Sequence, residues 1–156
     1  MRNPAIPVLA QNIRALGLEV FDDWFSPGPE ADEYWQKYEK DRGRTYKESL
    51  AGYHAKTVFA FDHHHLSRAS TVVLVMPAGR SAHLELGWAV GKGKKGFVLF
   101  DKEPERYDIM YQFATDIFFN EKDLLNVLSQ EHPGRSDQAD ERPPATNLRA
   151  TNYQLG

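Results

Sequence analysis

A glutamate that follows a small polar loop makes residues 77–85 the part of this chain best suited to chemistry. The loop, PAGRS, contains Gly79, which lets the backbone approach a ligand closely, and Arg80, which adds a cation. Ser81 is a good N-cap, so we expect a helix to begin there and its free N–H groups to receive an anion. Glu85 then falls at about the fourth helical position, where the helix dipole favours a carboxylate.

The ionised form of Glu85 defines the chemistry open to it. An unperturbed glutamate has a pKa of roughly 4.3, so we expect a carboxylate at neutral pH. A carboxylate can attack an anomeric carbon and hold the sugar as a covalent ester, while Ser81 binds a phosphate. Acidic residues are also common in the first turn of helices simply because the dipole favours them, so a purely structural role for Glu85 stays open.

The elements that must position this loop alternate between helices and strands. Residues 71–76 and 96–100 are continuous apolar runs, which is typical of parallel strands buried on both faces. Helices are expected over 5–16, 30–42 (or a lid), 46–69, 81–90, 106–114 and 120–129, and shorter strands over 18–24 and 116–119. This alternation predicts an α/β fold, specifically a flavodoxin-like three-layer sandwich with a parallel sheet. Ligands of such sheets bind beyond the carboxyl ends of the strands, where the PAGRS loop lies.

Length and composition limit the classes of partner. The chain has 156 residues, 41% of them hydrophobic, which suits one domain with a real core. A net charge of −3 gives no broad basic field, so no nucleic-acid partner is expected. The lack of cysteine excludes disulfides and thiolate zinc sites and favours a cytoplasmic location. No stretch approaches a membrane span or a signal peptide, so no membrane partner is expected.

The composition changes near the end of the chain. Residues 1–130 are expected to form the single domain. Residues 131–156 contain few large apolar side chains and several prolines and glycines, so they predict a disordered tail.

The loop and the helix after it carry a family resemblance. Residues 77–91, followed by a Gly-Lys-Lys-Gly turn and a strand, resemble the signature of the nucleoside 2-deoxyribosyltransferase family. In that family a Gly/Ser loop precedes Glu-x-Gly-[Tyr/Trp]-Ala, which here is the segment that begins at Glu85. The resemblance covers roughly residues 2–128 and is specific around 77–100. It implies that Glu85 is the nucleophile and that Gly79, Arg80 and Ser81 contact phosphate or sugar.

The resemblance implies further features of the site. The family has an Asp on the helix before the apolar strand that contacts the substrate and assists departure of the base; here it is Asp62. The Gly-Arg-Ser loop looks more like the branch that acts on 5′-monophosphates, which includes 2′-deoxynucleoside 5′-monophosphate N-glycosidases. The family fold opens with a strand that ends near a ligand-contacting Ser-Trp-Arg-Asn-type segment, which places Arg2 and Asn3 in the site and leads us to expect that the first strand is missing. Relatives complete their sites across subunit interfaces, so a homo-oligomer is implied, with no metal or organic cofactor.

Two other groups of residues could form a binding site. Asp22 and Trp24 lie where the strand expected within 18–24 runs into an acidic, aromatic loop. They can form a base pocket, with an aromatic face for stacking and a carboxylate for amine protons; the alternative is an ordinary acidic loop. The adjacent histidines at 63–65 point in different directions on a helix, so they cannot chelate one ion as a set. No metal site is therefore predicted.

The resemblance thus implies an enzyme that cleaves or transfers the N-glycosidic bond of a nucleoside or nucleoside 5′-monophosphate. Glu85 would form the covalent intermediate and Asp62 would help the base to leave. Two alternatives stay open: a TIR-related NAD glycohydrolase or cyclase, which also uses a Glu on a similar fold, and a non-catalytic nucleotide-binding sensor. NAD cleavage would release nicotinamide, whereas a sensor would bind nucleotide without turnover.

Overall fold

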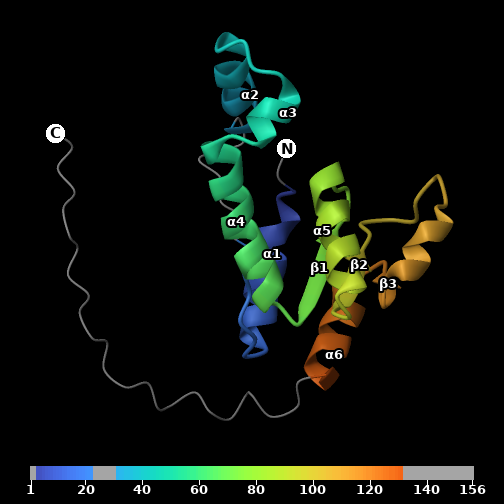
Figure 1. Ribbon diagram of the computed structural model, residues 1–156. Helices are drawn as coiled ribbons and strands as arrows, with labels where there is room; N and C mark the ends of the chain where they lie inside the picture. Colours follow the sequence, from blue (N-terminus) through green and yellow to red (C-terminus); the bar gives the residue numbers. More distant parts are fainter. Residues whose placement is uncertain (1–2, 23–30, 132–156) are drawn as a thin grey trace, which may run out of the picture.

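A computed structural model describes residues 3–22 and 31–131 and shows an α/β arrangement (Figure 1). Within this part of the chain three strands form one parallel sheet in the order β1-β2-β3: β1 (Thr71–Val75), β2 (Lys95–Leu99) and β3 (Asp116–Phe118). The connection from β1 to β2 is α5 (Arg80–Gly91), and the connection from β2 to β3 contains a 3-10 helix, η1 (Ile109–Phe113). The expected parallel α/β organisation is therefore confirmed.

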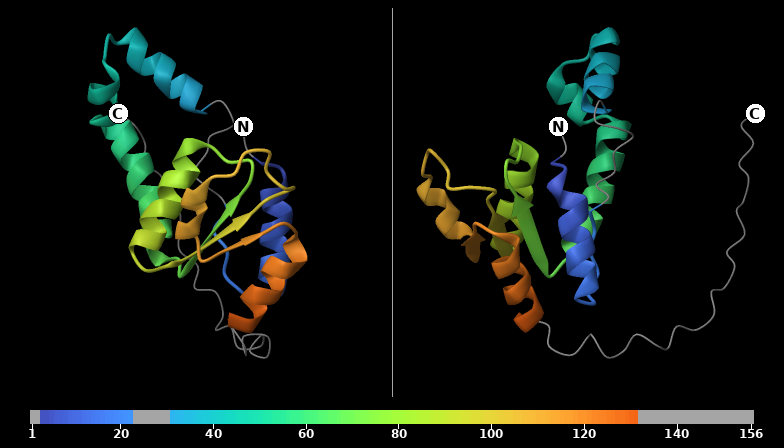
Figure 2. Two further views of the ribbon diagram at one scale, coloured as in Figure 1. Left: turned by 90° about the vertical axis from the view of Figure 1, so that its right-hand side faces the viewer. Right: turned by 180° about the vertical axis from the view of Figure 1, so that it is seen from behind.

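Helices flank the sheet (Figure 2). Alternate residues of β2 reach opposite faces, because side chains of a strand alternate in direction. One apolar cluster joins β2 and β3 to α1 (Ala5–Ala15) and α6 (Glu121–Glu131): Leu9, Ile13, Phe97, Leu99, Phe118, Leu124 and Leu128. The other joins β1 and β2 to α5: Leu74, Leu86, Val98 and Phe100. Burial on both faces explains why the strands are continuous apolar runs.

Helix α5 lies unusually close to β2. A Cβ built on Gly96 would stand 2.5 Å from Val90 Cγ2 and 2.8 Å from Leu86 Cδ1, so any larger residue would force the helix or its side chains to move. Glycine at this position therefore sets the distance between α5 and the sheet.

A single helix over 46–69 was expected, and the structure divides it in two. Helix α3 (Tyr46–Leu50) begins with a capping box in which Thr45 and Glu48 satisfy each other's backbone N–H groups. Helix α4 (Tyr53–Arg68) starts after Gly52, whose backbone is extended (φ −71°, ψ 160°). The extended backbone at Gly52 interrupts the helical path, which the sequence pattern did not indicate.

Two other expectations need correction. The strand predicted over 18–24 is not present in its described part, 18–22, because no hydrogen bond between described residues pairs this extended segment with a neighbouring strand. The helix predicted over 106–114 is reduced to η1. Helix α6 continues to Glu131, one residue beyond the expected domain boundary, and the predicted tail from 132 onward lies outside the described residues.

Helices α2 (Ala31–Asp41) and α3 extend beyond the amino end of α4, away from the sheet (Figures 1 and 2). The buried Glu39 of α2 accepts a hydrogen bond from Arg44 at 2.9 Å, which joins α2 to the turn before α3. At the opposite end of α4, Lys94 Nζ donates to the carbonyl oxygens of Ser67 (2.8 Å) and Ala69. No helix in the described ranges is long and apolar enough to cross a membrane.

Candidate active site

A cavity of about 1450 Å³ lies between α2, α3, α4 and the beginning of α5. It contains three of the residues that the sequence analysis selected: Asp62 from α4, and Ser81 and Glu85 from α5. The two carboxyl groups come from helices that are separate in sequence, and packing of α4 beside α5 brings them to one cavity.

The start of α5 differs from the expectation. Gly79, not Ser81, is the N-cap; its backbone is extended (φ −81°, ψ 178°) and its carbonyl oxygen accepts the N–H of His83 at 3.4 Å. The helix therefore begins at Arg80, and Ser81 makes no capping hydrogen bond. Counted from Arg80, Glu85 is the sixth helical residue, in the second turn rather than the first. The helix-dipole argument for Glu85 is correspondingly weak, because that effect falls off within the first turn.

Burial, and to a smaller extent the negative charge of Asp62, raise the pKa of Glu85 to about 7. The expectation of a fully ionised Glu85 at neutral pH is therefore wrong, since at its pKa a carboxyl group is half protonated. The reason is desolvation: the half-buried side chain has lost water that would stabilise its charged form. A carboxyl group with such a pKa can exchange a proton near neutral pH.

Asp62 shares this environment. Burial raises the pKa of Asp62, and the nearby His65 opposes the shift. Among the described residues, no group donates a hydrogen bond to the buried Oδ1 of Asp62. A buried carboxylate oxygen without a donor is costly, so the arrangement favours a ligand that brings an N–H or O–H to this atom.

Aromatic side chains form much of the remaining wall. Trp35 and Tyr38 of α2 face the cavity with Tyr53 and Phe59 of α4. The buried indole Nε1 of Trp35 has no hydrogen-bond partner in the described part of the chain. Flat apolar walls with few polar groups suit a planar heterocycle. The sequence analysis did not assign these residues, although the spacing of Trp35 and Tyr38 places both on one side of a helix.

His83, two residues before Glu85, has a definite structural role. Its Nδ1 lies 2.8 Å from the carbonyl oxygen of Gly79, and its Nε2 lies 3.0 Å from the hydroxyl of Tyr111 on η1. The carbonyl can only accept, so Nδ1 donates to Gly79, while Nε2 lies within hydrogen-bond distance of the Tyr111 hydroxyl, which also lies 3.8 Å from Sδ of Met76. His83 thereby connects the loop before α5 to η1.

The other predicted site residues do not line this cavity. Gly79 and Arg80 are exposed at the amino end of α5. Asp22 forms an ion pair with Arg14 and lines a different cavity, beside β1. Asn3 donates from Nδ2 to the carbonyl oxygen of Met76 at 3.1 Å, just beyond the carboxyl end of β1.

Arg2 and Trp24 lie outside the described residues. The histidines at 63–65 make ring contacts instead of one shared site: His63 packs against Trp88 at 4.9 Å and His65 stacks on Phe21 at 3.8 Å between ring centroids. In residues 3–22 and 31–131 no group of three or more His, Asp or Glu side chains could hold a metal ion.

In comparison with known proteins, no family model, no curated protein and no solved structure matches this chain.

Proposed function

We propose that this protein cleaves or transfers the N-glycosidic bond of a nucleoside or nucleoside 5′-monophosphate. The observation that carries the proposal is the pair of half-buried carboxyl groups, Asp62 and Glu85, in one aromatic-walled cavity. Such pairs serve glycosyl chemistry because one carboxyl group attacks the anomeric carbon while the other manages a proton.

The reaction would proceed in two balanced steps. In the productive form Glu85 is ionised and Asp62 holds the proton that the pair shares near neutral pH. Glu85 attacks C1′, the bond from C1′ to the base nitrogen breaks, and its electron pair leaves with the base, which takes the proton from Asp62. Water or a second base then attacks C1′, Asp62 recovers a proton, and Glu85 is released as a carboxylate. No metal or organic cofactor takes part in these steps.

Two sides of the cavity would recognise two parts of the substrate, the base and the 5′-phosphate. The aromatic wall that includes Trp35 and Phe59 would stack on the base. A 5′-phosphate would lie near Ser81 and the free N–H groups at the start of α5, with Arg80 supplying a cation and Gly79 allowing close approach. This assignment favours 5′-monophosphates over free nucleosides.

Two structural proposals accompany this function. We take the sheet and its helices as a flavodoxin-like three-layer sandwich, since separate apolar clusters involve α1 with α6 and α5. We also propose a homo-oligomer, because large apolar side chains around the cavity mouth are exposed, with Tyr53 at 86% and Leu84 at 76%.

The direct test is a substrate panel of nucleosides, 5′-monophosphates and NAD, read by chromatography for free base. Release of a purine or pyrimidine base, fastest from a 5′-monophosphate, supports the proposal. Release of nicotinamide from NAD would instead indicate a glycohydrolase, and binding without turnover would indicate a sensor. A 2-fluoro sugar substrate should leave an adduct that mass spectrometry locates on Glu85; an adduct elsewhere contradicts the assigned nucleophile.

A further inference from the structure

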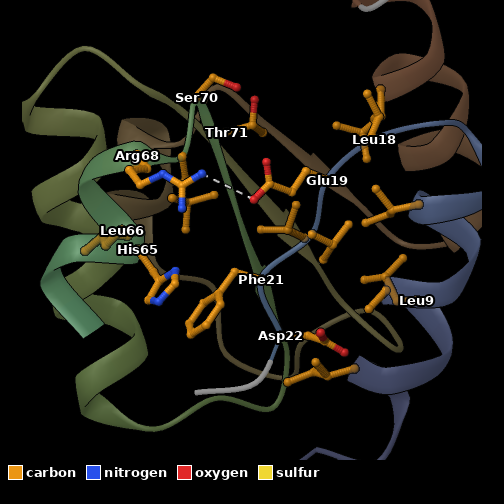
Figure 3. A pocket seen from close by; sticks show the side chains of 18 of the residues that line it. Leu9, Leu18, Glu19, Phe21, Asp22, His65, Leu66, Arg68, Ser70 and Thr71 are labelled. Atoms are coloured by element: carbon orange, nitrogen blue, oxygen red, sulfur yellow. Dashed lines mark hydrogen bonds and ion pairs between the residues drawn. The ribbon is translucent and has the colours of Figure 1, made fainter. Parts of the chain in front are cut away.

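Beside β1 lies a cavity of about 460 Å³ whose carboxyl groups are paired with arginines (Figure 3). Glu19 pairs with Arg68 at 3.4 Å, and Asp22 pairs with Arg14. A small-molecule site needs a few polar groups that are free to orient its ligand. The paired charges of this cavity therefore do not indicate a ligand, and the opposite end of the sheet, beside β3, has a different kind of surface.

An apolar patch covers the β3 end of the sheet, on the side of the molecule away from α4 (Figures 1 and 2). Six large apolar or aromatic side chains are exposed between residues 107 and 119. We call this surface the η1 patch, and its members are Tyr107, Ile109, Met110, Phe113, Ile117 and Phe119. Contiguous apolar patches on the surface of soluble proteins mark interaction sites.

The η1 patch is continuous across two elements. Tyr111 of η1 and Phe119, just after β3, both pack on the buried Phe100, with ring centroids 5.4 Å and 5.5 Å from it. Phe118 enters the cluster with α1 and α6, so the alternation of side chains along β3 directs Ile117 to the face that carries Tyr111. The two elements therefore form one surface.

Hydrogen bonds hold η1 in place. The hydroxyl of Tyr111 lies 3.0 Å from Nε2 of His83 on α5. At the start of η1 the carboxylate of Asp108 accepts the N–H of Met110 at 3.0 Å. A surface that is already ordered loses little conformational entropy on binding, so the η1 patch suits a partner of defined shape.

The free edge of β3 does not favour an added strand. β3 is only three residues long. The N–H of Phe100 on the β2 side donates to the carbonyl oxygen of Phe118, so the alternate residue Ile117 directs its backbone away from β2. There the N–H of Ile117 donates to the side chain of Asp116 at 2.8 Å, which occupies a donor that an added strand would need. Short strands and edge charges protect against strand pairing, so a partner would bind through side chains.

The η1 patch has an acidic rim. Residues 101–119 contain five acidic and two basic side chains, a net charge of −3. The whole chain also has a net charge of −3, so the rest of it is neutral overall. All seven charged side chains are exposed, and none forms an ion pair within residues 3–22 and 31–131. They are Asp101, Lys102, Glu103, Glu105, Arg106, Asp108 and Asp116. The rim is therefore able to attract a basic partner.

The acidic rim distinguishes between classes of partner. A second copy of the chain would bring two surfaces of the same negative charge together, and like charges that face each other across an interface oppose association. The same repulsion acts against nucleic acids and against the anionic surface of a membrane. The favoured partner has basic side chains on either side of an apolar face.

We propose that the η1 patch binds a basic amphipathic helix of a partner protein. The apolar residues of such a helix recur every three or four positions and would pack on Ile109, Phe113 and Ile117. Lysines and arginines beside them would face the acidic rim and increase the rate of association. No member of the η1 patch lines the cavity that contains Asp62 and Glu85, so this interaction is separate from the candidate active site.

Model peptides test the apolar face and the charge separately. A helical Leu/Lys peptide of about 18 residues, with its leucines along one face, should bind the full 156-residue protein in fluorescence anisotropy. A Leu/Glu peptide with the same leucine pattern should not bind, and neither should a Ser/Lys peptide, which has no apolar face. Equal binding by either control, or no binding of the Leu/Lys peptide at about 100 μM, overturns the proposal.

Two exposed aromatic residues give a matched pair of substitutions. Phe113→Ser in the η1 patch should weaken binding of the Leu/Lys peptide at least about tenfold, because it removes an apolar anchor. Tyr46→Ser on α3, at a residue of similar exposure, should leave binding unchanged. Equal effects of the two substitutions would place the peptide somewhere else.

Charge reversal tests the rim. Glu105→Lys should slow association of the Leu/Lys peptide at least about threefold in stopped-flow fluorescence. Glu33→Lys on α2 changes the net charge of the chain equally and should have a smaller effect, since Glu33 is exposed outside the η1 patch. Equal slowing by both would mean that the peptide responds only to net charge, which contradicts an acidic rim at this site.

Amide shift mapping by NMR locates the peptide on the unaltered protein, so it decides the question even if a variant fails to fold. Shifts caused by the Leu/Lys peptide should be concentrated in residues 107–119. Shifts centred on residues 31–59 would assign the peptide to the aromatic wall of the other cavity and refute the proposal.

Two measurements check the other occupants. If Ile109→Asp dissociated an oligomer in sedimentation velocity, the η1 patch would be an interface between copies of this chain. If the wild-type protein bound phosphatidylcholine vesicles and Ile109→Asp did not, the patch would bind lipid. Either result rejects the helix assignment. None of these experiments needs catalytic turnover, so their outcome does not depend on the proposed function.

Discussion

Asp62 on α4 and Glu85 on α5 line the same cavity, and the charge of Asp62 raises the pKa of Glu85. No residue adjacent in sequence accounts for this part of the pKa shift of Glu85. The shift arises because two helices pack together on one side of the sheet. Because the two carboxyl groups interact, the protonation of each depends on the other, and the pair titrates as a unit.

Replacing Glu85 with Gln should lower kcat by roughly 10³-fold or more, because an amide cannot form the covalent glycosyl ester. Binding of the best substrate from the panel, measured by calorimetry, should survive, since the side chain keeps its size. Glu85→Ala is the matched variant and should lose turnover equally. A Glu85→Gln enzyme that keeps most of its rate would exclude the covalent mechanism.

Folding stability should depend on pH through Glu85. Its pKa in the folded protein is about 7, against an ordinary value of 4.5, so the folded state holds this proton more tightly than the unfolded state. The stabilisation is complete below the unfolded value and is lost as the pH rises through about 7. The shift corresponds to at most ~3 kcal/mol, and partial exposure reduces it to about 1–2 kcal/mol.

Urea unfolding at pH 5 and pH 8 measures this dependence. Glu85→Gln should remove that part of the stability loss, and the exposed Glu105→Gln serves as control. An identical pH dependence in wild type and Glu85→Gln would show that Glu85 does not titrate differently on folding.

Asp62→Asn should have two effects. Turnover should fall about 10²–10⁴-fold, the usual contribution of a proton donor to the leaving group. In the wild type kcat/KM should fall as the pair loses its shared proton near pH 7; in Asp62→Asn it should instead rise with ionisation of Glu85 alone, at a pH below 7, because the Asp62 charge that raises the pKa of Glu85 is gone. A pH–rate profile measures both. Loss of rate with an unshifted profile would mean that Asp62 acts without electrostatic coupling to Glu85.

Arg80→Ala should raise KM for a 5′-monophosphate about tenfold or more and leave the free nucleoside little changed, because Arg80 would contact only the phosphate. Steady-state kinetics on the two substrates give the comparison. Arg80→Lys should restore part of the difference, since it returns the charge without the bidentate geometry. Equal effects of Arg80→Ala on both substrates would indicate a structural role.

Sedimentation velocity at micromolar concentration should find an oligomer. Phe59, 69% exposed beside the cavity mouth, is the residue chosen for the test, and Phe59→Asp should shift the protein toward monomer. Ile109→Asp on η1, at a site 75% exposed, should leave the assembly unchanged. Only monomer in the wild-type protein would contradict a homo-oligomer.

The sequence was most informative where one local signal decides the structure. Strands β1 and β2 were predicted within a residue or so, because burial on both faces demands a continuous apolar run. The start of α5 was misplaced because Ser81 has the stronger intrinsic preference for an N-cap, whereas the extended backbone of Gly79 determines where the helix begins.

Features that depend on residues distant in the sequence could not be predicted from it. The pKa of Glu85 is set by burial beneath helices that the sequence could not place beside it. The segment 18–22 has the composition of a strand, but no strand among the described residues pairs with it. The cavity brings in Trp35 and Phe59 from α2 and α4, and no motif connects those positions to Glu85.

Lys94 restricts how the two helices of the candidate site can move relative to each other. Its ammonium fastens the carboxyl end of α4 to the turn that follows α5, so the two helices are clasped at one end. Relative motion of the helices is therefore a swing about that clasp, largest at their amino ends and smallest near Lys94. A wider cavity mouth would then accommodate larger ligands. The distance between the carboxyl groups of Asp62 and Glu85 would change less than the width of the mouth, because both residues lie closer to Lys94.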